Sequence, residues 1–448
     1  MGLSSIVSKA SAAVAGSPSH GHAGNGASSQ QLGSSPSQDK APEGAAADDT
    51  EVLDDEPKNM LLALIGQLRV GMDLSKITLP VFVLEPRSML ERVTDFHSHP
   101  ELLHGAASLP VEERFIQVLR YYLAGWHIKP KGVKKPYNPV LGEFFRCRYD
   151  YPDGSVAYYV SEQVSHHPPI SAWYFSSPEN GLDLCGELKP KSKFLGNSAA
   201  TIMEGESHLR FLDGEATKDG EYDITMPNMY ARGILFGKMV LELGDSSIVR
   251  NNQTGMSCDV EFKTKYNSIA GKIKSPKGDV GDISGHWSDV MEIHRKSTKS
   301  RETLFDAHNA SVTEKSVSPE SQQQPNESRR LWSKVTSAIK ANDIDAATDA
   351  KTEIEDAQRE SARLRDERGE KFTSKYFKLS EKGEWRPNFQ LPQGDKSTQR
   401  EAVRKFVYDS DPEPSSSTSA SAPSSTTATS SIPPSATTTA PPPATSTV

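Results

Sequence analysis

Short runs of valine, tyrosine, phenylalanine and isoleucine, separated by turn residues, occupy the chain from about residue 138 to residue 292. Residues 157–164, 170–175 and 258–262 are examples, and a turn signal at residues 152–154 precedes the first of them. Runs of this length that are rich in β-branched and aromatic residues are typical of strands. Many short strands at close spacing predict an antiparallel barrel or sandwich, and the sequence shows no internal repeat.

Helical periodicity flanks the strand region on both sides. Apolar residues recur at helical spacing over residues 60–68, and again over residues 115–122 in a helix that we expect to end near Gly125. A heavily charged helix is predicted from about residue 345 to residue 368, with Gly369 as its stop signal. The strand region is therefore expected to be framed by helices.

The two ends of the chain differ in composition from the middle. Residues 1–56 are rich in serine, alanine and glycine, and the segment 391–448 is mostly serine, threonine, proline and alanine, without charge after Glu413. Such segments cannot bury enough apolar surface to offset the entropy cost of ordering. We expect disordered tails at 1–56 and over most of 391–448, and one domain at 57–390 whose last ordered stretch ends near residues 385–388.

Composition excludes several classes of protein. The 59 acidic and 51 basic side chains give a formal net charge of -8, which argues against a general nucleic-acid binder. Cys147, Cys185 and Cys258 lie far apart, so neither a disulfide scaffold nor a common structural zinc site is expected, and a reducing compartment is. No apolar run approaches the length of a membrane span and no signal-peptide pattern occurs, which predicts a soluble cytosolic protein.

The most unusual local sequence is EQVSHHPP, at residues 162–169, where His166 and His167 stand before two prolines. Because a residue before proline is held in extended geometry, His167 cannot lie in a helix, and a turn between strands is one interpretation. Metal binding is weaker, because adjacent residues of extended chain point apart and no third ligand stands at a recognisable spacing. Anion binding is the third interpretation, since two imidazoles can donate hydrogen bonds to phosphate oxygens.

Two further segments carry hydrogen-bond donors. Lys135 and Asn138 lie in the proline-stiffened sequence KKPYNPVLGEFF, and Lys351, Glu355 and Arg359 follow each other at four-residue spacing on one helix stripe. A tight loop with a solvated lysine and a solvated salt-bridged face are the simpler interpretations. Together with the histidines, these residues would make a donor-rich cradle for a phosphate. No P-loop, GxSxG or GxGxxG motif accompanies them, so phosphate recognition without phosphoryl transfer is favoured.

EQVSHHPP and KPYNPVLGE resemble the signature blocks of the oxysterol-binding protein family. Further resemblance lies in residues 224–237, 329–339 and 351–359, and the likeness covers about residues 57–390. It implies a mainly β fold with flanking helices: a large incomplete antiparallel β-barrel around a hydrophobic lipid tunnel. An N-terminal lid at about residues 57–85 and a C-terminal helical region would complete this lipid-binding domain.

The resemblance also implies a site. Family members bind phosphatidylinositol 4-phosphate with the acyl chains inside the tunnel, and the residues at the matching headgroup positions are Lys135, Asn138, His166, His167, Lys351 and Arg359, with Glu355 beside them. The segments 73–94 and 189–199 resemble the yeast homologues that exchange phosphatidylserine for phosphatidylinositol 4-phosphate. By that likeness Leu79, Lys191 and Ser192 would lie near the serine headgroup.

These implications predict a cytosolic lipid-transfer protein that exchanges phosphatidylinositol 4-phosphate and a second lipid, for which phosphatidylserine is expected, between membranes. It would touch endoplasmic reticulum, plasma membrane or Golgi contacts transiently, and would need no cofactor, metal, nucleic acid or catalytic residue. A sterol exchanger and a lipid sensor that transfers nothing are the alternatives. A phosphoinositide hydrolase would need a nucleophile or metal-binding carboxylates beside the histidines, and none is apparent.

Overall fold

A computed structural model describes residues 69–73, 80–128, 134–234, 239–264 and 266–414. The helix expected over residues 60–68 lies outside the described residues, as does most of the segment expected to form a lid. Among the described residues, no helix is both long and apolar enough to cross a membrane.

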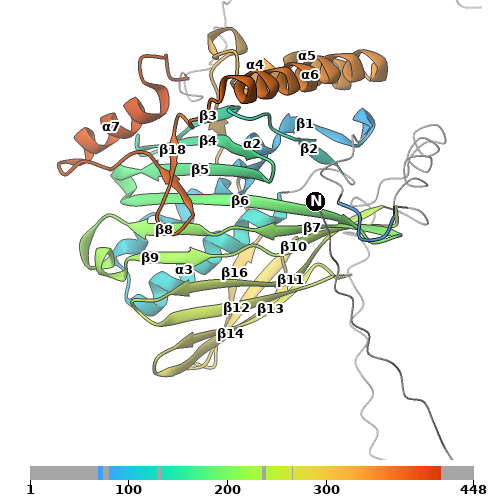
Figure 1. Ribbon diagram of the computed structural model, residues 1–448. Coiled ribbons are helices and arrows are strands. Elements are labelled where there is room, and N and C mark those ends of the chain that lie inside the picture. Colours follow the sequence, from blue (N-terminus) through green and yellow to red (C-terminus); the bar gives the residue numbers. More distant parts are fainter. Residues whose placement is uncertain (1–68, 74–79, 129–133, 235–238, 265, 415–448) are drawn as a thin grey trace, which may run out of the picture. The chain divides into compact units, whose positions relative to one another are not determined.

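A 15-stranded antiparallel sheet dominates the described part of the chain (Figure 1). Its path runs from β16 through β11 to β10, then through β7 and β6 to β3 and β17, while β8 and β9 join β6 to β11. No pairing joins β16 to β17 among the described residues, so the barrel is incomplete, as expected. The strands are β3 Phe144–Asp150, β4 Val156–His166, β5 Pro169–Ser177, β6 Leu182–Phe194, β7 Ser198–Glu204, β8 Ser207–Phe211, β9 Glu221–Ile224, β10 Asn228–Arg232, β11 Val240–Asn251, β12 Met256–Lys263, β13 Ser268–Ser275, β14 Gly278–His286, β15 Val290–Arg295, β16 Arg301–Asp306 and β17 Lys315–Ser316.

Helix α3, Val111–Ala124, packs against the inner face of this sheet and supplies much of its core. Phe115 and Leu119 are fully buried, and the helix ends immediately before Gly125, as the sequence predicts. Arg114 is buried beside them, where its Nε donates to Asp219 at 2.6 Å, because a buried guanidinium needs a carboxylate partner.

A smaller layer lies beyond β3 and contains β1 Leu84–Ser88, which pairs in parallel with β2 Lys135–Tyr137. The long charged helix α6, Ile344–Arg368, begins with an Asp343 cap and ends with Gly369 at φ 64°, in agreement with the predicted bounds. The remaining helices of this region are α2 Met89–Arg92, α4 Ser328–Leu331 and α5 Ser333–Lys340, and the 3-10 helices of the chain are η2 Val81–Val83, η3 Val93–His97, η4 Pro100–Leu103, η5 Ala106–Ser108, η6 Gly125–His127, η7 Pro178–Asn180, η8 Gly214–Asp219 and η9 Glu320–Gln322.

The C-terminal boundary expected at residues 385–390 is wrong. After the hairpin of β18, Phe377–Leu379, and β19, Trp385–Pro387, the chain forms helix α7, Lys396–Tyr408. Val403, Val407 and Tyr408 are buried with residues of β4 and β5. The apolar spacing of this helix is confined to its last two turns, whereas its first turns are polar, so the periodic pattern is too short to indicate a helix from the sequence.

Candidate functional site

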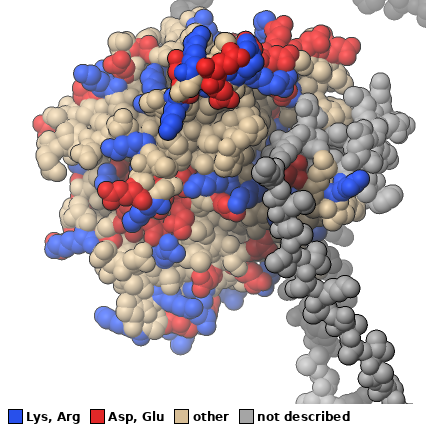
Figure 2. Space-filling model, in the orientation of Figure 1, with Lys and Arg blue, Asp and Glu red and all other residues tan. Residues whose placement is uncertain are grey.

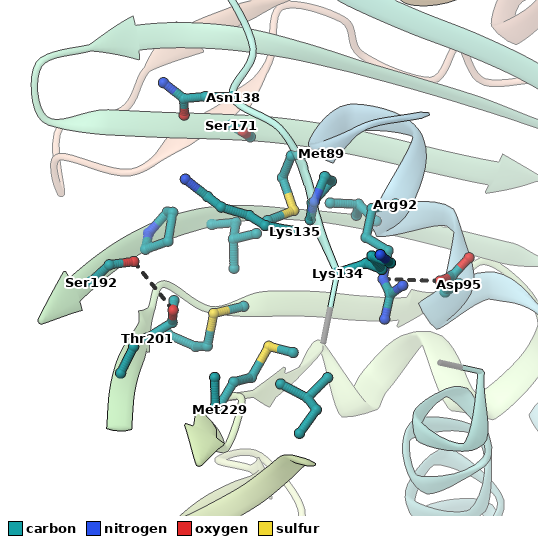
Figure 3. Close-up of a pocket in the computed structure, with 18 of the residues that line it drawn as sticks. Met89, Arg92, Asp95, Lys134, Lys135, Asn138, Ser171, Ser192, Thr201 and Met229 are labelled. Atoms are coloured by element: carbon teal, nitrogen blue, oxygen red, sulfur yellow. Dashed lines mark hydrogen bonds and ion pairs between the residues drawn. The ribbon is translucent and has the colours of Figure 1, made fainter. Parts of the chain in front are cut away.

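Two cavities meet at the segment Lys135–Asn138, whose four residues line both. The first, of about 290 Å³, is a tunnel with mostly apolar walls from β6, β7, β10 and the start of β11 (Figure 3). Leu188, Phe194, Leu241 and Leu243 are among these wall residues. The tunnel expected from the family resemblance is therefore present.

The second cavity, of about 700 Å³, lies between the β4–β5 turn, β2 and α6. The structure brings together here all the residues expected to bind a lipid headgroup, since each of them lines this cavity: Lys135, Asn138, His166, His167, Lys351, Glu355 and Arg359. Three segments far apart in the sequence supply them. Their convergence could not be derived from sequence spacing.

The histidines stand on the turn that the sequence predicts, because β4 ends at His166 and β5 begins at Pro169. Their rings are 4.5 Å apart between centroids, and the Nδ1 atom of His166 is buried without a hydrogen-bond partner among the described residues. Burial and the neighbouring His167 ring lower the pKa of His166, and Glu355 opposes this. A neutral imidazole here can still donate one hydrogen bond to an anion.

Lys135 is the cation at the junction of the two cavities. Burial and then the nearby Lys351 ammonium lower the pKa of its amine, and it forms no ion pair with the described residues. A partly buried ammonium without a counter-ion is costly, and an anionic ligand would remove that cost.

Helix α6 presents two different faces. On the cavity side, Lys351 is 13% exposed and its Nζ lies 2.6 Å from Glu355 Oε1. On the outer side, Arg363 pairs with Glu360 and Glu367, and acidic and basic residues alternate over this part of the surface (Figure 2). The stripe of Lys351, Glu355 and Arg359 is salt-bridged as expected, because Lys351 pairs with Glu355 and the exposed Arg359 pairs with Asp356, and the same three residues line the cavity.

A fully buried carboxylate, Glu143, holds the junction segment in place. It accepts hydrogen bonds from the Ser88 and Ser328 hydroxyls, from Trp332 Nε1 at 2.9 Å and from the backbone amide of Val140 at 3.0 Å. Burial raises the pKa of Glu143, and these donors oppose that shift. Sequence reasoning gave Glu143 no role, although it ends the block KPYNPVLGE.

Further cavity residues escaped sequence reasoning. Gln358 and Arg365 follow Lys351 at successive spacings of seven on α6 and line the same cavity. This seven-residue spacing is the sequence pattern from which Gln358 and Arg365 could have been predicted to face the same cavity as Lys351. Phe372 and Trp385 line it too, but they come from the segment after α6 and carry no local pattern.

The residues expected near a serine headgroup are placed differently from one another. Leu79 lies outside the described residues. Ser192 lines the tunnel, with its Oγ 3.2 Å from Thr201 Oγ1 (Figure 3). Lys191 is 55% exposed and pairs with Glu204 at 2.6 Å on the outer face, because successive side chains of a strand point to opposite faces. Lys191 therefore points away from the tunnel, and its expected position near the serine headgroup is wrong.

Potential metal ligands gather elsewhere, around His208, where Glu206 and Glu384 form one group with it and Glu221 and Asp223 another. None of these five residues lines either cavity. Their carboxylates are already paired, since Arg386 binds Glu221 and Glu384 while Arg250 binds Glu206 and Asp223. The cluster is accounted for as an ion-pair network.

A sequence model described as oxysterol-binding protein matches residues 63–340, more than half of the chain. The chain belongs to the oxysterol-binding protein family. An oxysterol-binding protein homologue of Schizosaccharomyces pombe is 46% identical over 366 residues, which are 77% of this chain and 76% of that protein. Oxysterol-binding protein homologue 6 of Saccharomyces cerevisiae is 45% identical over 352 residues, 75% of this chain and 78% of the relative.

Solved structures show the same fold. The Osh1 ORD domain in complex with ergosterol superposes with a TM-score of 0.65 at 25% identity, covering 84% of this chain and 94% of that one. The Osh3 ORD of Saccharomyces cerevisiae in complex with PI(4)P gives a TM-score of 0.58 at 22% identity, over 79% of this chain and 94% of the other. The mainly β fold expected from the resemblance is confirmed.

Proposed function

We propose that this protein binds phosphatidylinositol 4-phosphate and a second lipid in turn and exchanges them between membranes. The observation that carries the proposal is the position of Lys135, a cation without an ion-pair partner among the described residues, where an apolar tunnel meets a cavity lined by donors. An amphiphile with acyl chains and an anionic phosphate matches both environments. No step of this exchange breaks a covalent bond, so we propose no catalytic residue and no cofactor.

Charge supports the phosphate assignment. Lys135, Lys351, Arg359 and Arg365 with Glu355 give a formal charge of +3 (four cations less one carboxylate), while the histidines add donors. A phosphate monoester carries about -1.5 to -2 at neutral pH, so the ligand would offset more than half of this charge. The relative that binds PI(4)P, the Osh3 ORD, shares the fold.

Phosphatidylserine is our proposal for the second lipid. Ser171, Ser192 and Thr201 bring hydroxyl groups to the tunnel wall beside Asn138. A serine headgroup needs several buried donors and acceptors, whereas a sterol needs one hydroxyl partner and apolar walls. A sterol remains the second candidate because the Osh1 ORD domain, which shares the fold, is bound to ergosterol in its structure.

The headgroup assignment is tested by replacing both histidines, His166→Ala with His167→Ala. The variant should extract phosphatidylinositol 4-phosphate from liposomes at least tenfold less than wild type, because each hydrogen bond to a charged group contributes roughly 1.5–3 kcal/mol. His294→Ala with His308→Ala is the matched control, since neither residue lines the tunnel or the headgroup cavity. Normal extraction of phosphatidylinositol 4-phosphate by the folded His166/His167 variant would show that the two histidines do not bind the headgroup.

A competition experiment separates the two candidates for the second lipid. Wild-type protein loaded with fluorescent phosphatidylinositol 4-phosphate is mixed with liposomes that contain phosphatidylserine, ergosterol or phosphatidylcholine. We expect displacement by phosphatidylserine only. Displacement by ergosterol alone would replace the proposed exchange with the sterol alternative, and displacement by neither would favour a sensor that carries one lipid.

A further inference from the structure

Four methionines line the tunnel, out of ten in the chain: Met89, Met203, Met229 and Met239. They come from four separate elements, namely α2, β7, β10 and the residue before β11. Figure 3 shows Met89 and Met229 on opposite sides of the cavity. The apolar wall is thus unusually rich in one flexible residue type.

The strand register explains how three of them share one wall. Met229 pairs with Thr201 across β10 and β7, and Met203 is two residues further along β7, so Met203 and Met229 are diagonal neighbours on the inner face. Met239 precedes Leu241 and Leu243 at two-residue spacing, and all three line the tunnel.

Methionine differs physically from the leucine that could fill the same space. Its side chain is unbranched, rotates about three bonds and ends in a polarizable thioether, so it repacks at low cost around partners of different shape. Protein surfaces that bind many partners use methionine in this way. The headgroup cavity is of the opposite kind, because Glu143 anchors its wall with four hydrogen bonds.

We propose that these four methionines form an adaptable wall that lets the tunnel accept acyl chains of different length and unsaturation. Selectivity then resides in the rigid headgroup cavity, and the chains are accepted broadly. This inference rests on the proposed lipid-binding function and adds to it which residues set the tolerance for the chains. It also explains how one tunnel can serve two lipids whose chains differ.

The test replaces all four side chains by leucine, M89L/M203L/M229L/M239L, a change that nearly conserves volume. The control is M256L/M291L, which alters two buried methionines outside the tunnel. Each protein is incubated with liposomes whose phosphatidylserine and phosphatidylinositol 4-phosphate carry mixed saturated, monounsaturated and polyunsaturated chains. The protein is then reisolated, and the bound species are quantified by mass spectrometry.

Wild type and control should take up species in nearly the proportions of the donor membrane, and the leucine variant should favour one chain class at least threefold. An unchanged profile in the leucine variant, at full or reduced total uptake, would overturn the inference. Wild type that takes up no lipid would instead overturn the proposed function. If the fourfold variant does not fold, M203L/M229L and M89L/M239L are measured separately and must shift the profile.

Discussion

At the scale of single residues, Lys135 in the headgroup cavity lowers the stability of the ligand-free protein and favours the binding of an anionic ligand. Lys135 forms no ion pair within the described part of the chain, and burial followed by repulsion from Lys351 lowers the pKa of its amine. A base whose pKa is lower in the folded state lowers the free energy of unfolding below that pKa, and this loss fades as pH rises towards the unfolded value. An anionic ligand would restore the lost stability at neutral pH.

Lys135→Met is therefore expected to stabilise the empty protein while it abolishes lipid uptake. The free energy of unfolding at pH 7 should rise by up to about 1 kcal/mol, or roughly 2 °C in Tm, because an unpaired charge is replaced by an apolar chain. The gain should shrink as the pH rises towards 10.5, the ordinary pKa of a lysine amine. Differential scanning calorimetry and a liposome extraction assay measure the two effects, and a destabilised variant would contradict the account of Lys135.

The neighbours Lys191 and Ser192 test whether strand alternation decides which side chain of β6 contacts the second lipid. Ser192→Ala should lower phosphatidylserine uptake about five- to tenfold, since one hydrogen bond contributes about 1–1.5 kcal/mol, and should leave phosphatidylinositol 4-phosphate uptake unchanged. Lys191→Ala is the adjacent control, because its ammonium pairs with Glu204 at the surface. Equal losses of phosphatidylserine uptake in both variants would show that the Ser192 hydroxyl makes no specific contact with this lipid.

At the scale of elements, local patterns predicted well those segments whose ends carry chemical signals. Helix α6 has an aspartate cap and a left-handed glycine stop, and α3 is followed immediately by Gly125, so both helices could be bounded from sequence. The β4–β5 turn followed from the prolines after His167. Helix α7 was missed, because its apolar contacts, Val403, Phe406, Val407 and Tyr408, are confined to its last two turns and give only a short periodic pattern.

Truncation separates α7 from the tail. A chain that ends at residue 414 should unfold at the same temperature as the full chain. A chain that ends at residue 390 loses three buried side chains worth about 5 kcal/mol together, and it removes Asp411 from the buried Arg146. This is comparable with the whole stability of a domain, so the shorter chain should be insoluble or melt at least 10 °C lower. Equal melting of the two truncations would mean that α7 contributes nothing.

At the scale of the whole molecule, the site could be assembled from sequence only through the family resemblance. Hydrogen-bond donors were recognisable at Lys135, His166 and Lys351 as residue types, but their meeting depends on β2, the β4–β5 turn and α6 folding to one place. Periodicity carries no information on such long-range convergence. The same limit explains why Glu143, which ties three segments together, and the methionine wall had no signal in the sequence.

Because one tunnel opens into one headgroup cavity at Lys135–Asn138, the two lipids should exclude each other, and this determines how they stabilise the protein. A ligand at 100 times its Kd raises the free energy of unfolding by about 2.7 kcal/mol. Two lipids bound at independent sites would add to about 5.5 kcal/mol. Two that compete for one site give RT ln 201, or about 3.1 kcal/mol.

We expect the smaller value when phosphatidylserine and phosphatidylinositol 4-phosphate are supplied together, each in short-chain soluble form, and the free energy of unfolding is measured by denaturant titration. An additive result would mean that both lipids are bound at once, and a carrier of that kind could not use the gradient of one lipid to move the other.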